Sequence, residues 1–297
     1  MRFEEKLIQY TDSINRALDE LSAVPDNLQR EVYEAMRYSL MAGGKRIRPV
    51  LTLAVCDMLG GCEEDALLFG TAIECIHTYS LIHDDLPCMD NDDLRRGKPT
   101  CHKKFGESTA LLAGDGLLTY AFGRMADLDS YHRVSHTDAL RLIAEASRYA
   151  GCDGMIGGQV VDLACEGRDD VGIDTLVYMH RRKTGALIHL AAEAGAYAAG
   201  ADSAELKKIG EYADGIGLAF QIKDDILDFT SSTETLGKPV GSDSENGKTT
   251  YVTHYGIEGA RKKLDEATDF AIESIKYFGE KAGFLIELAE YLINRKN

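Results

Sequence analysis

The placement of proline limits what this chain can fold into. Its five prolines lie at positions 25, 49, 87, 99 and 239, so residues 100–238 contain none. Proline breaks helices, whereas the Ala, Leu and Glu that are abundant in this stretch favour them. Apolar residues recur at steps of three or four, and no strand-like alternation is sustained. The sequence therefore predicts an all-α fold.

Helical spacing continues along almost the whole chain. The first helix is expected to begin near Phe3, and Asp202 with Glu205 forms a capping box that begins a helix running to about Phe229. No linker, composition shift or repeat divides the chain, so we expect a single domain over residues 1–297. The other predicted helices span 26–40, 46–60, 63–85, 107–128, 136–150, 153–165, 174–199 and 257–294.

Composition excludes several classes of function. The net charge of −16 disfavours binding to nucleic acid or to an anionic membrane. No stretch free of charged side chains approaches the ~18 apolar residues of a membrane span. The charged N-terminus, MRFEEKLIQY, resembles neither a secretion signal nor a transit peptide, and the seven cysteines include no C-x-x-C pair. We therefore expect a cytoplasmic protein with reduced thiols and no zinc site.

Two acidic clusters follow apolar helices: HDDLPCMD at 83–90 and KDDILD at 223–228. Asp224 and Asp228 are four residues apart and share one helix face, while Pro87 must end or bulge its helix and lets the carboxylates on either side approach each other. Mg²⁺ takes one or two carboxylates and completes its shell with water and phosphate oxygens. The clusters therefore indicate metal sites for a phosphate-bearing ligand, although acidic helix ends can also be ordinary solvated surface.

Basic residues gather in four short motifs. Any one of them could be an exposed loop, and His77, on the helix face of Asp84, could be an ordinary core histidine. Four such motifs in an acidic protein, two of them adjoining acidic clusters, instead indicate recognition of diphosphate. Arg46 and Arg182 are expected at the surface. The motifs are GGKRIRP at 43–49, DDLRRGKPT at 92–100, RRKT at 181–184 and GKP at 237–239.

Together these residues resemble the short-chain trans-isoprenyl diphosphate synthases of bacterial type, and most closely the farnesyl diphosphate synthases. The resemblance implies an isoprenoid synthase fold, with roughly ten or more helices around a central active-site cavity, and a homodimer. It covers nearly the whole chain and rests on the motifs GGKRIRP at 43–49, DDLPCMD at 84–90, DDLRRGKPT at 92–100, AGDGLL at 113–118, GGQVVDL at 157–163, KTG at 183–185, QIKDDILD at 221–228 and GKPVGSD at 237–243.

The resemblance implies a role for each motif. Mg²⁺, with three ions per active site and Mn²⁺ as an alternative, would be held by Asp84, Asp85, Asp90, Asp224 and Asp228. Isopentenyl diphosphate would be bound without metal by Lys45, Arg48, His77 and Arg96. Allylic diphosphate would be contacted by Arg95, Lys183, Thr184, Gln221 and Lys238. Three of these residues would also act catalytically, because the backbone carbonyl of Lys183 and the side-chain oxygens of Thr184 and Gln221 would point their dipoles at the allylic cation. Gln221 could instead cap a buried backbone group, and Lys248 could be a plain loop cation.

The implied reaction joins isopentenyl diphosphate to dimethylallyl or geranyl diphosphate, with the expelled diphosphate as base, and yields farnesyl diphosphate. Tyr79 and Ser80 lie about 6–7.5 Å along the helix axis from Asp84, and in the family these positions govern chain length. Tyr followed by Ser resembles enzymes that stop at farnesyl diphosphate, with geranylgeranyl diphosphate as the alternative. A terpene cyclase would not need a second anion site, and a noncatalytic partner subunit would have degraded acidic clusters; both remain more distant alternatives.

Overall fold

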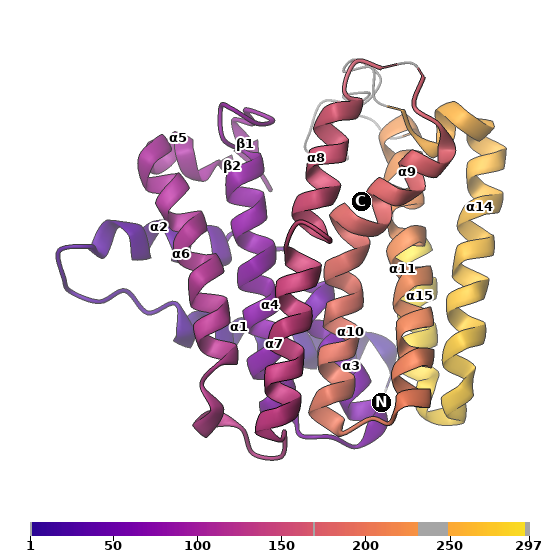
Figure 1. Ribbon diagram of the computed structural model, residues 1–297, viewed down its shortest axis with the longest axis horizontal. Helices are drawn as coiled ribbons and strands as arrows, with labels where there is room; N and C mark the ends of the chain where they lie inside the picture. Colours follow the sequence, from indigo (N-terminus) through magenta and orange to yellow (C-terminus); the bar gives the residue numbers. More distant parts are fainter. Residues whose placement is uncertain (1, 169, 231–248, 295–297) are drawn as a thin grey trace. The chain divides into compact units, whose positions relative to one another are not determined.

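The computed structural model describes residues 2–168, 170–230 and 249–294, and it is helical almost throughout (Figure 1). The all-α prediction is confirmed, and the short β1 and β2 strands form the one ladder within the described residues. The described residues form two compact units. Unit 1 contains the described residues within 1–143 with 197–200, and unit 2 contains those within 144–196 and 201–297. The prediction of a single domain stays a prediction.

Unit 1 is organised around α4, which spans Glu63–Asp84 and packs against α3 and α6. Its apolar side chains, including Phe69, Ile73 and Ile76, are fully buried. Since α4 is apolar around most of its circumference, it forms the centre of this unit. The other elements of unit 1 are α1 Phe3–Leu21, α2 Arg30–Leu40, α3 Ile47–Leu59, β1 Leu94–Arg95, β2 Lys98–Pro99, α5 Cys101–Phe105, α6 Glu107–Met125 and η1 Leu128–Ser130.

The turn predicted at Pro87 is present. The helix α4 ends at Asp84, and the backbone N–H of Asp90 donates to the Asp84 carbonyl at 2.9 Å. This hydrogen bond brings the two ends of the first acidic cluster together, as expected from a proline that cannot continue a helix.

Unit 2 is organised around α11, which spans Ser203–Thr230 and packs along α14. The predicted capping box begins α11: the Asp202 N–H donates to Glu205, and the Glu205 N–H donates to Asp202, both at 2.9 Å. Tyr212 is fully buried, and its hydroxyl donates to the Leu285 carbonyl at 2.6 Å. The other elements are α8 Met155–Cys165, α9 Ile173–His180, η2 Arg181–Gly185, α14 Tyr251–Ile275, η3 Lys276–Ala282 and α15 Gly283–Asn294, and α7 His136–Ala150 and α10 Ala186–Ala199 each contribute to both units.

Several helix predictions differ from the structure in detail, and the helix predicted over 26–40 begins only at Arg30. The helix predicted over 174–199 is divided by η2, a π-helical turn over Arg181–Gly185. The helix predicted over 257–294 is divided into α14, η3 and α15, and α14 is itself kinked at Gly256, with φ 67°, one residue before the predicted start. The segment before this kink begins at Tyr251, and the Thr250 side chain caps it by accepting a hydrogen bond from the Thr253 N–H at 3.2 Å. No helix within the described residues is long and apolar enough to cross a membrane.

A half-buried histidine in unit 2, His189, lies between two carboxylates. The His189 ring nitrogens lie 2.7 Å from Asp214 Oδ1 and 3.3 Å from Glu193 Oε1, and the ring packs on Tyr149. Burial lowers the pKa of His189, but the hydrogen bonds to both carboxylates outweigh burial and raise the pKa to about 9. His189 is therefore protonated at neutral pH and joins α10 to α11.

We predict that His189→Gln destabilises the protein in a pH-dependent way. The folded-state pKa is raised, so the stabilisation is complete below about pH 6.5 and disappears as the pH rises through about 9. The loss should be on the order of 2–3 kcal/mol at pH 6 and small at pH 10. Thermal melting of both proteins at the two pH values measures this difference. The exposed His136→Gln serves as control, and an equal loss at both pH values would contradict the assignment.

Candidate active site

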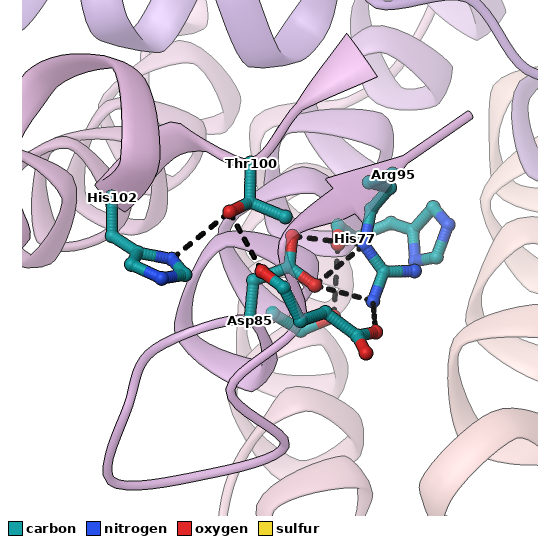
Figure 2. A network of polar contacts seen from close by, with 7 residues as sticks. His77, Asp85, Arg95, Thr100 and His102 are labelled. Carbon is teal, nitrogen blue, oxygen red and sulfur yellow. Dashed lines mark hydrogen bonds and ion pairs between the residues drawn. The ribbon is translucent and has the colours of Figure 1, made fainter. Parts of the chain in front are cut away.

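Within the first acidic cluster, Asp84 and Asp85 lie in different surroundings. Asp84 is half-buried, whereas Asp85 is buried, with a relative exposure of 3%. Arg95 Nε donates to both Asp85 oxygens, at 2.7 and 2.9 Å, and Nη2 donates to Oδ1 at 2.5 Å (Figure 2). The structure pairs Asp85, which was predicted as a metal ligand, with Arg95, which was predicted as a diphosphate contact. Both roles stay predictions.

The loop that carries Arg95 is held by a second set of hydrogen bonds. The Thr100 hydroxyl donates to the Asp92 carbonyl at 2.8 Å, and it lies 3.1 Å from Nδ1 of the buried His102 (Figure 2). Because the hydroxyl proton is used on the carbonyl, the imidazole N–H is the donor in the second contact. This network closes the 92–100 loop and fixes Arg95 against Asp85.

The residues predicted to bind isopentenyl diphosphate come together in unit 1. Arg96 Nη1 donates to the Gly43 carbonyl, so the second basic motif lies against the first. A Cβ at Gly44 would lie 2.6 Å from the Arg96 guanidinium carbon, and only glycine allows this approach. Lys45 is exposed on the same loop, and Arg48 is half-buried in the first turn of α3.

Burial and neighbouring charges shift the pKa values of Arg48 and His77. Burial lowers the pKa of Arg48 to about 10, and Glu74 opposes that shift. Burial, reinforced by Arg48 and Arg96, holds the pKa of His77 well below its ordinary value, so the imidazole is neutral and can donate a hydrogen bond without carrying charge. Among the described residues, nothing accepts a hydrogen bond from the buried Nε of Arg48. An anion would satisfy that donor.

The prediction that Arg46 lies at the surface is wrong. Its side chain is 2% exposed, and Nη1 donates to Glu74 Oε1 at 2.7 Å. Arg46 adopts a left-handed backbone conformation, with φ 51°, which turns its side chain inward at the start of α3. Arg182 is also not freely exposed, because its guanidinium carbon lies 3.6 Å from the centre of the Tyr178 ring.

In unit 2, the π-helical turn η2 carries Lys183 and Thr184, which are both half-buried. Lys183 Nζ donates to Asp162 Oδ2 at 2.5 Å. Four residues before Asp162, Gly158 lies so close to the Lys183 backbone that a Cβ would not fit. The sequence analysis gave neither α8 residue a role, although their i, i+4 spacing already placed both on one helix face.

The predicted residues of α11 lie near this turn. Gln221 Nε2 lies 3.5 Å from Asp224 Oδ2, and the side chains of Asp224 and Asp228 are half-buried. Asp225 is buried and accepts a hydrogen bond from the Tyr251 N–H at 2.7 Å. A solvent-open cleft of about 720 Å³ is lined by Lys183, Gln221 and Asp224, and also by Asp162, His180, Leu176, Met179 and Thr250.

His180 is a second residue of this cleft that the sequence analysis missed. It is 5% exposed, and its ring stacks on Tyr251, with the ring centres 5.8 Å apart. Burial lowers its pKa to about 4, so the ring is neutral at physiological pH. The sequence offers no signal for it, because His180 is the last residue of an apolar helix and precedes the basic motif.

The arrangement of the carboxylates suits Mg²⁺ better than it suits a metal ion whose ligands all come from the protein. Within the described residues, no group of three His, Cys, Asp or Glu side chains is arranged to hold a metal ion. Asp84 with Asp90, and Asp224 with Asp228, instead offer sparse pairs that suit an ion retaining water and phosphate oxygens. Asp85 fits less well, because Arg95 engages both of its oxygens. Lys238 and Lys248 lie outside the described residues.

The two predicted chain-length residues differ in burial. Tyr79 is 5% exposed, packs edge-on against His83 with ring centres 5.7 Å apart, and has a buried hydroxyl for which the described residues offer no hydrogen-bond partner. Ser80 is half-buried, and its hydroxyl donates to the His77 carbonyl at 2.8 Å. Tyr79 is therefore the bulky apolar element at this level of α4.

Comparison with known proteins identifies similar sequences over nearly the whole chain. A chloroplast protein of Arabidopsis thaliana, named as the large subunit 1 of a heterodimeric geranylgeranyl pyrophosphate synthase, is 45% identical over 99% of this chain and 80% of its own length. The chloroplast geranylgeranyl pyrophosphate synthase of Capsicum annuum is 46% identical over 96% of this chain and 76% of its own length.

Solved structures of synthases and transferases of this kind are also similar to this chain. An FPP/GFPP synthase from Zymomonas mobilis is 39% identical, with a TM-score of 0.88 and 98% of both chains covered. A geranyltransferase from Legionella pneumophila is 32% identical, with a TM-score of 0.85 over 99% of this chain and 97% of its own. The sequence pattern of the polyprenyl synthetase family matches residues 29–277. The chain therefore belongs to the polyprenyl synthetase family and is a prenyltransferase of the isoprenoid synthase fold.

Proposed function

We propose that this protein catalyses the Mg²⁺-dependent condensation of isopentenyl diphosphate with allylic diphosphates. One observation carries the proposal: unit 1 holds two chemically different sets of charged residues. The carboxylates of Asp84 and Asp90 follow α4, and a separate group with Arg48, His77 and Arg96 gathers around the GGKRIRP loop. A reaction between two diphosphates, one bound through metal and one bound by cations alone, needs both sets.

The roles of the side chains follow from their surroundings. Asp84, Asp90, Asp224 and Asp228 would hold Mg²⁺, which when bound stabilises the charge that develops on the departing diphosphate. Arg48 and Arg96 would neutralise isopentenyl diphosphate, and the neutral His77 would donate to it without adding charge. Lys183, now on Asp162, would contact the allylic diphosphate. The oxygens of Thr184 and Gln221 would stabilise the allylic cation electrostatically.

Geranylgeranyl diphosphate is the product that we propose. Relatives of 45% and 46% identity are named as geranylgeranyl synthases, and these names fit the alternative product better than the predicted farnesyl diphosphate. One structural observation keeps farnesyl diphosphate as the second candidate: the buried, bulky Tyr79 lies five residues before Asp84 on α4. The number of metal ions, the homodimer and the cytoplasmic location stay predictions.

The other classes fit less well. A terpene cyclase consumes one diphosphate and has no use for a second anion site, yet Arg96 lies against the loop of Lys45. A noncatalytic partner subunit would not need its acidic clusters, and both are intact. Incubation of the purified protein with Mg²⁺, radiolabelled isopentenyl diphosphate and each allylic starter, followed by chromatography of the products, tests the proposal. The absence of any elongated product would refute it.

A first prediction separates metal ligands from structural carboxylates. Asp84→Asn and Asp224→Asn should lower turnover by about 100-fold or more, because they remove ligands that stabilise the leaving group. Their neighbours are matched controls: Asp85→Asn and Asp225→Asn remove charge-assisted hydrogen bonds and should lower the melting temperature by roughly 3–10 °C. Assays of turnover and melting on all four variants check this. If the Asp84 and Asp85 variants, or the Asp224 and Asp225 variants, lower turnover and melting temperature equally, the division into metal ligands and structural carboxylates is wrong.

A second prediction separates the two diphosphate sites. Arg48→Ala or Arg96→Ala removes a charge-assisted contact of about 1.5–3 kcal/mol, which should raise KM for isopentenyl diphosphate by about 10- to 150-fold. KM for the allylic substrate should change little. Steady-state kinetics with each substrate varied in turn measure both constants. If KM rises only for the allylic substrate, the two sites are exchanged.

A third prediction concerns product length. Tyr79→Ala should lengthen the main product, because it removes the bulky side chain at this level of α4. Ser80→Phe should shorten it, because it adds bulk to the helix face shared with Asp84. Product sizing by chromatography measures the effect, and the wild-type distribution decides between the two candidate products. If neither variant changes the distribution, these residues do not limit the chain.

A further inference from the structure

Arg46 lies in the middle of the GGKRIRP loop, yet its guanidinium is the most completely engaged of the described basic residues in that loop. Nη1 donates to Glu74 Oε1 at 2.7 Å, Nη2 to the Leu40 carbonyl at 2.6 Å, and Nε to Asn15 Oδ1 at 3.1 Å. Arg46 is 2% exposed and Glu74 3%. Arg46 therefore links four helices, α1, α2, α3 and α4, and has little capacity left to contact a ligand.

The backbone conformation of Arg46 controls where its neighbours point. Its φ of 51° is a left-handed conformation that is sterically unfavourable for a residue other than glycine. Such a conformation persists only when the surroundings impose it, and strain of this kind is concentrated at functional sites. Here the three side-chain hydrogen bonds impose it. They thereby fix where α3 begins, with Lys45 exposed before Arg46 and Arg48 two residues after it.

Glu74 contributes charge as well as a hydrogen bond. It lies three residues before His77 on α4, and it opposes the lowering of the pKa of both Arg48 and Arg96 that burial causes. Without a buried carboxylate, the clustered guanidinium groups would repel one another. The same residue therefore holds the loop and offsets the charge of the anion-binding group.

We propose that the Arg46–Glu74 pair is a positioning device for the isopentenyl diphosphate site: it fixes the 43–48 loop so that Lys45, Arg48 and Arg96 converge on one anion. This inference rests on the proposed function. Arg46 itself does not touch substrate. It acts through the start of α3 and through the contact between Gly43 and Arg96.

Arg46→Lys is the main test, because it keeps the charge but cannot reproduce three divergent hydrogen bonds. Isopentenyl diphosphate alone has no reaction partner, so titration calorimetry without Mg²⁺ and without allylic substrate measures its Kd directly. We expect Kd to rise about 10- to 100-fold, the usual cost of misplaced binding groups. KM for the allylic substrate and kcat at saturation should stay within about threefold of the wild-type values, which is less than a tenfold change in affinity.

Three further variants make the outcome decisive. Asp65→Asn breaks a different buried site on α4, where the carboxylate accepts the N–H groups of His132, Arg133 and Val134, so it should lower stability without changing Kd. Asn15→Ala removes one partner of Arg46 and gives a milder test if Arg46→Lys does not fold. Arg48→Ala reports on the site itself.

These variants separate failure of the inference from failure of the assigned site. If Arg48→Ala weakens binding while Arg46→Lys and Asn15→Ala do not, the positioning role is wrong and the site assignment remains. If Arg48→Ala leaves Kd unchanged, the isopentenyl diphosphate site lies elsewhere. If Asp65→Asn raises Kd as much as Arg46→Lys does, the effect is general destabilisation, and the inference is overturned.

Discussion

The candidate site depends on one arrangement: within a charged motif, two adjacent residues of the same charge contact different partners. Adjacent residues on a helix point about 100° apart, so two consecutive carboxylates can contact different partners. In the first acidic cluster, Asp85 is buried against Arg95 while Asp84 remains half-buried. In the second, Asp225 is buried and holds the N-terminus of α14, while Asp224 is half-buried. Each Asp pair thus combines one buried, structural carboxylate and one that is more exposed to solvent.

The basic residues obey the same rule. Lys45 is exposed, and the adjacent Arg46 is buried against Glu74. Gathering several cations at one place costs electrostatic free energy unless a counter-charge is near. Glu74 supplies that counter-charge in unit 1, and Asp162 supplies it to Lys183 in unit 2. Carboxylates with little exposure to solvent therefore hold basic side chains of both units in place.

Sequence periodicity could predict the helices because their apolar spacing is strong, and it could predict the turn at Pro87 because proline has a local effect. Periodicity could not predict which charged residues are buried or which partner each of them contacts. Whether Arg46 points inward depends on its backbone angle, which tertiary contacts with Asn15 and Leu40 decide. The pairing of Asp85 with Arg95 depends equally on how a loop folds back, and no spacing rule contains that information.

Two glycines show how the backbone completes the arrangement. At Gly44 the Arg96 guanidinium occupies the space of a side chain, and at Gly158 the backbone of Lys183 does. At Gly44, in the loop before α3, the approaching group is a guanidinium, whereas at Gly158, on α8, it is the backbone that carries Lys183. A larger residue at either position would therefore force the glycine backbone or the basic residue beside it to shift. The glycines of these motifs thus set the position of charge as directly as the charged residues themselves.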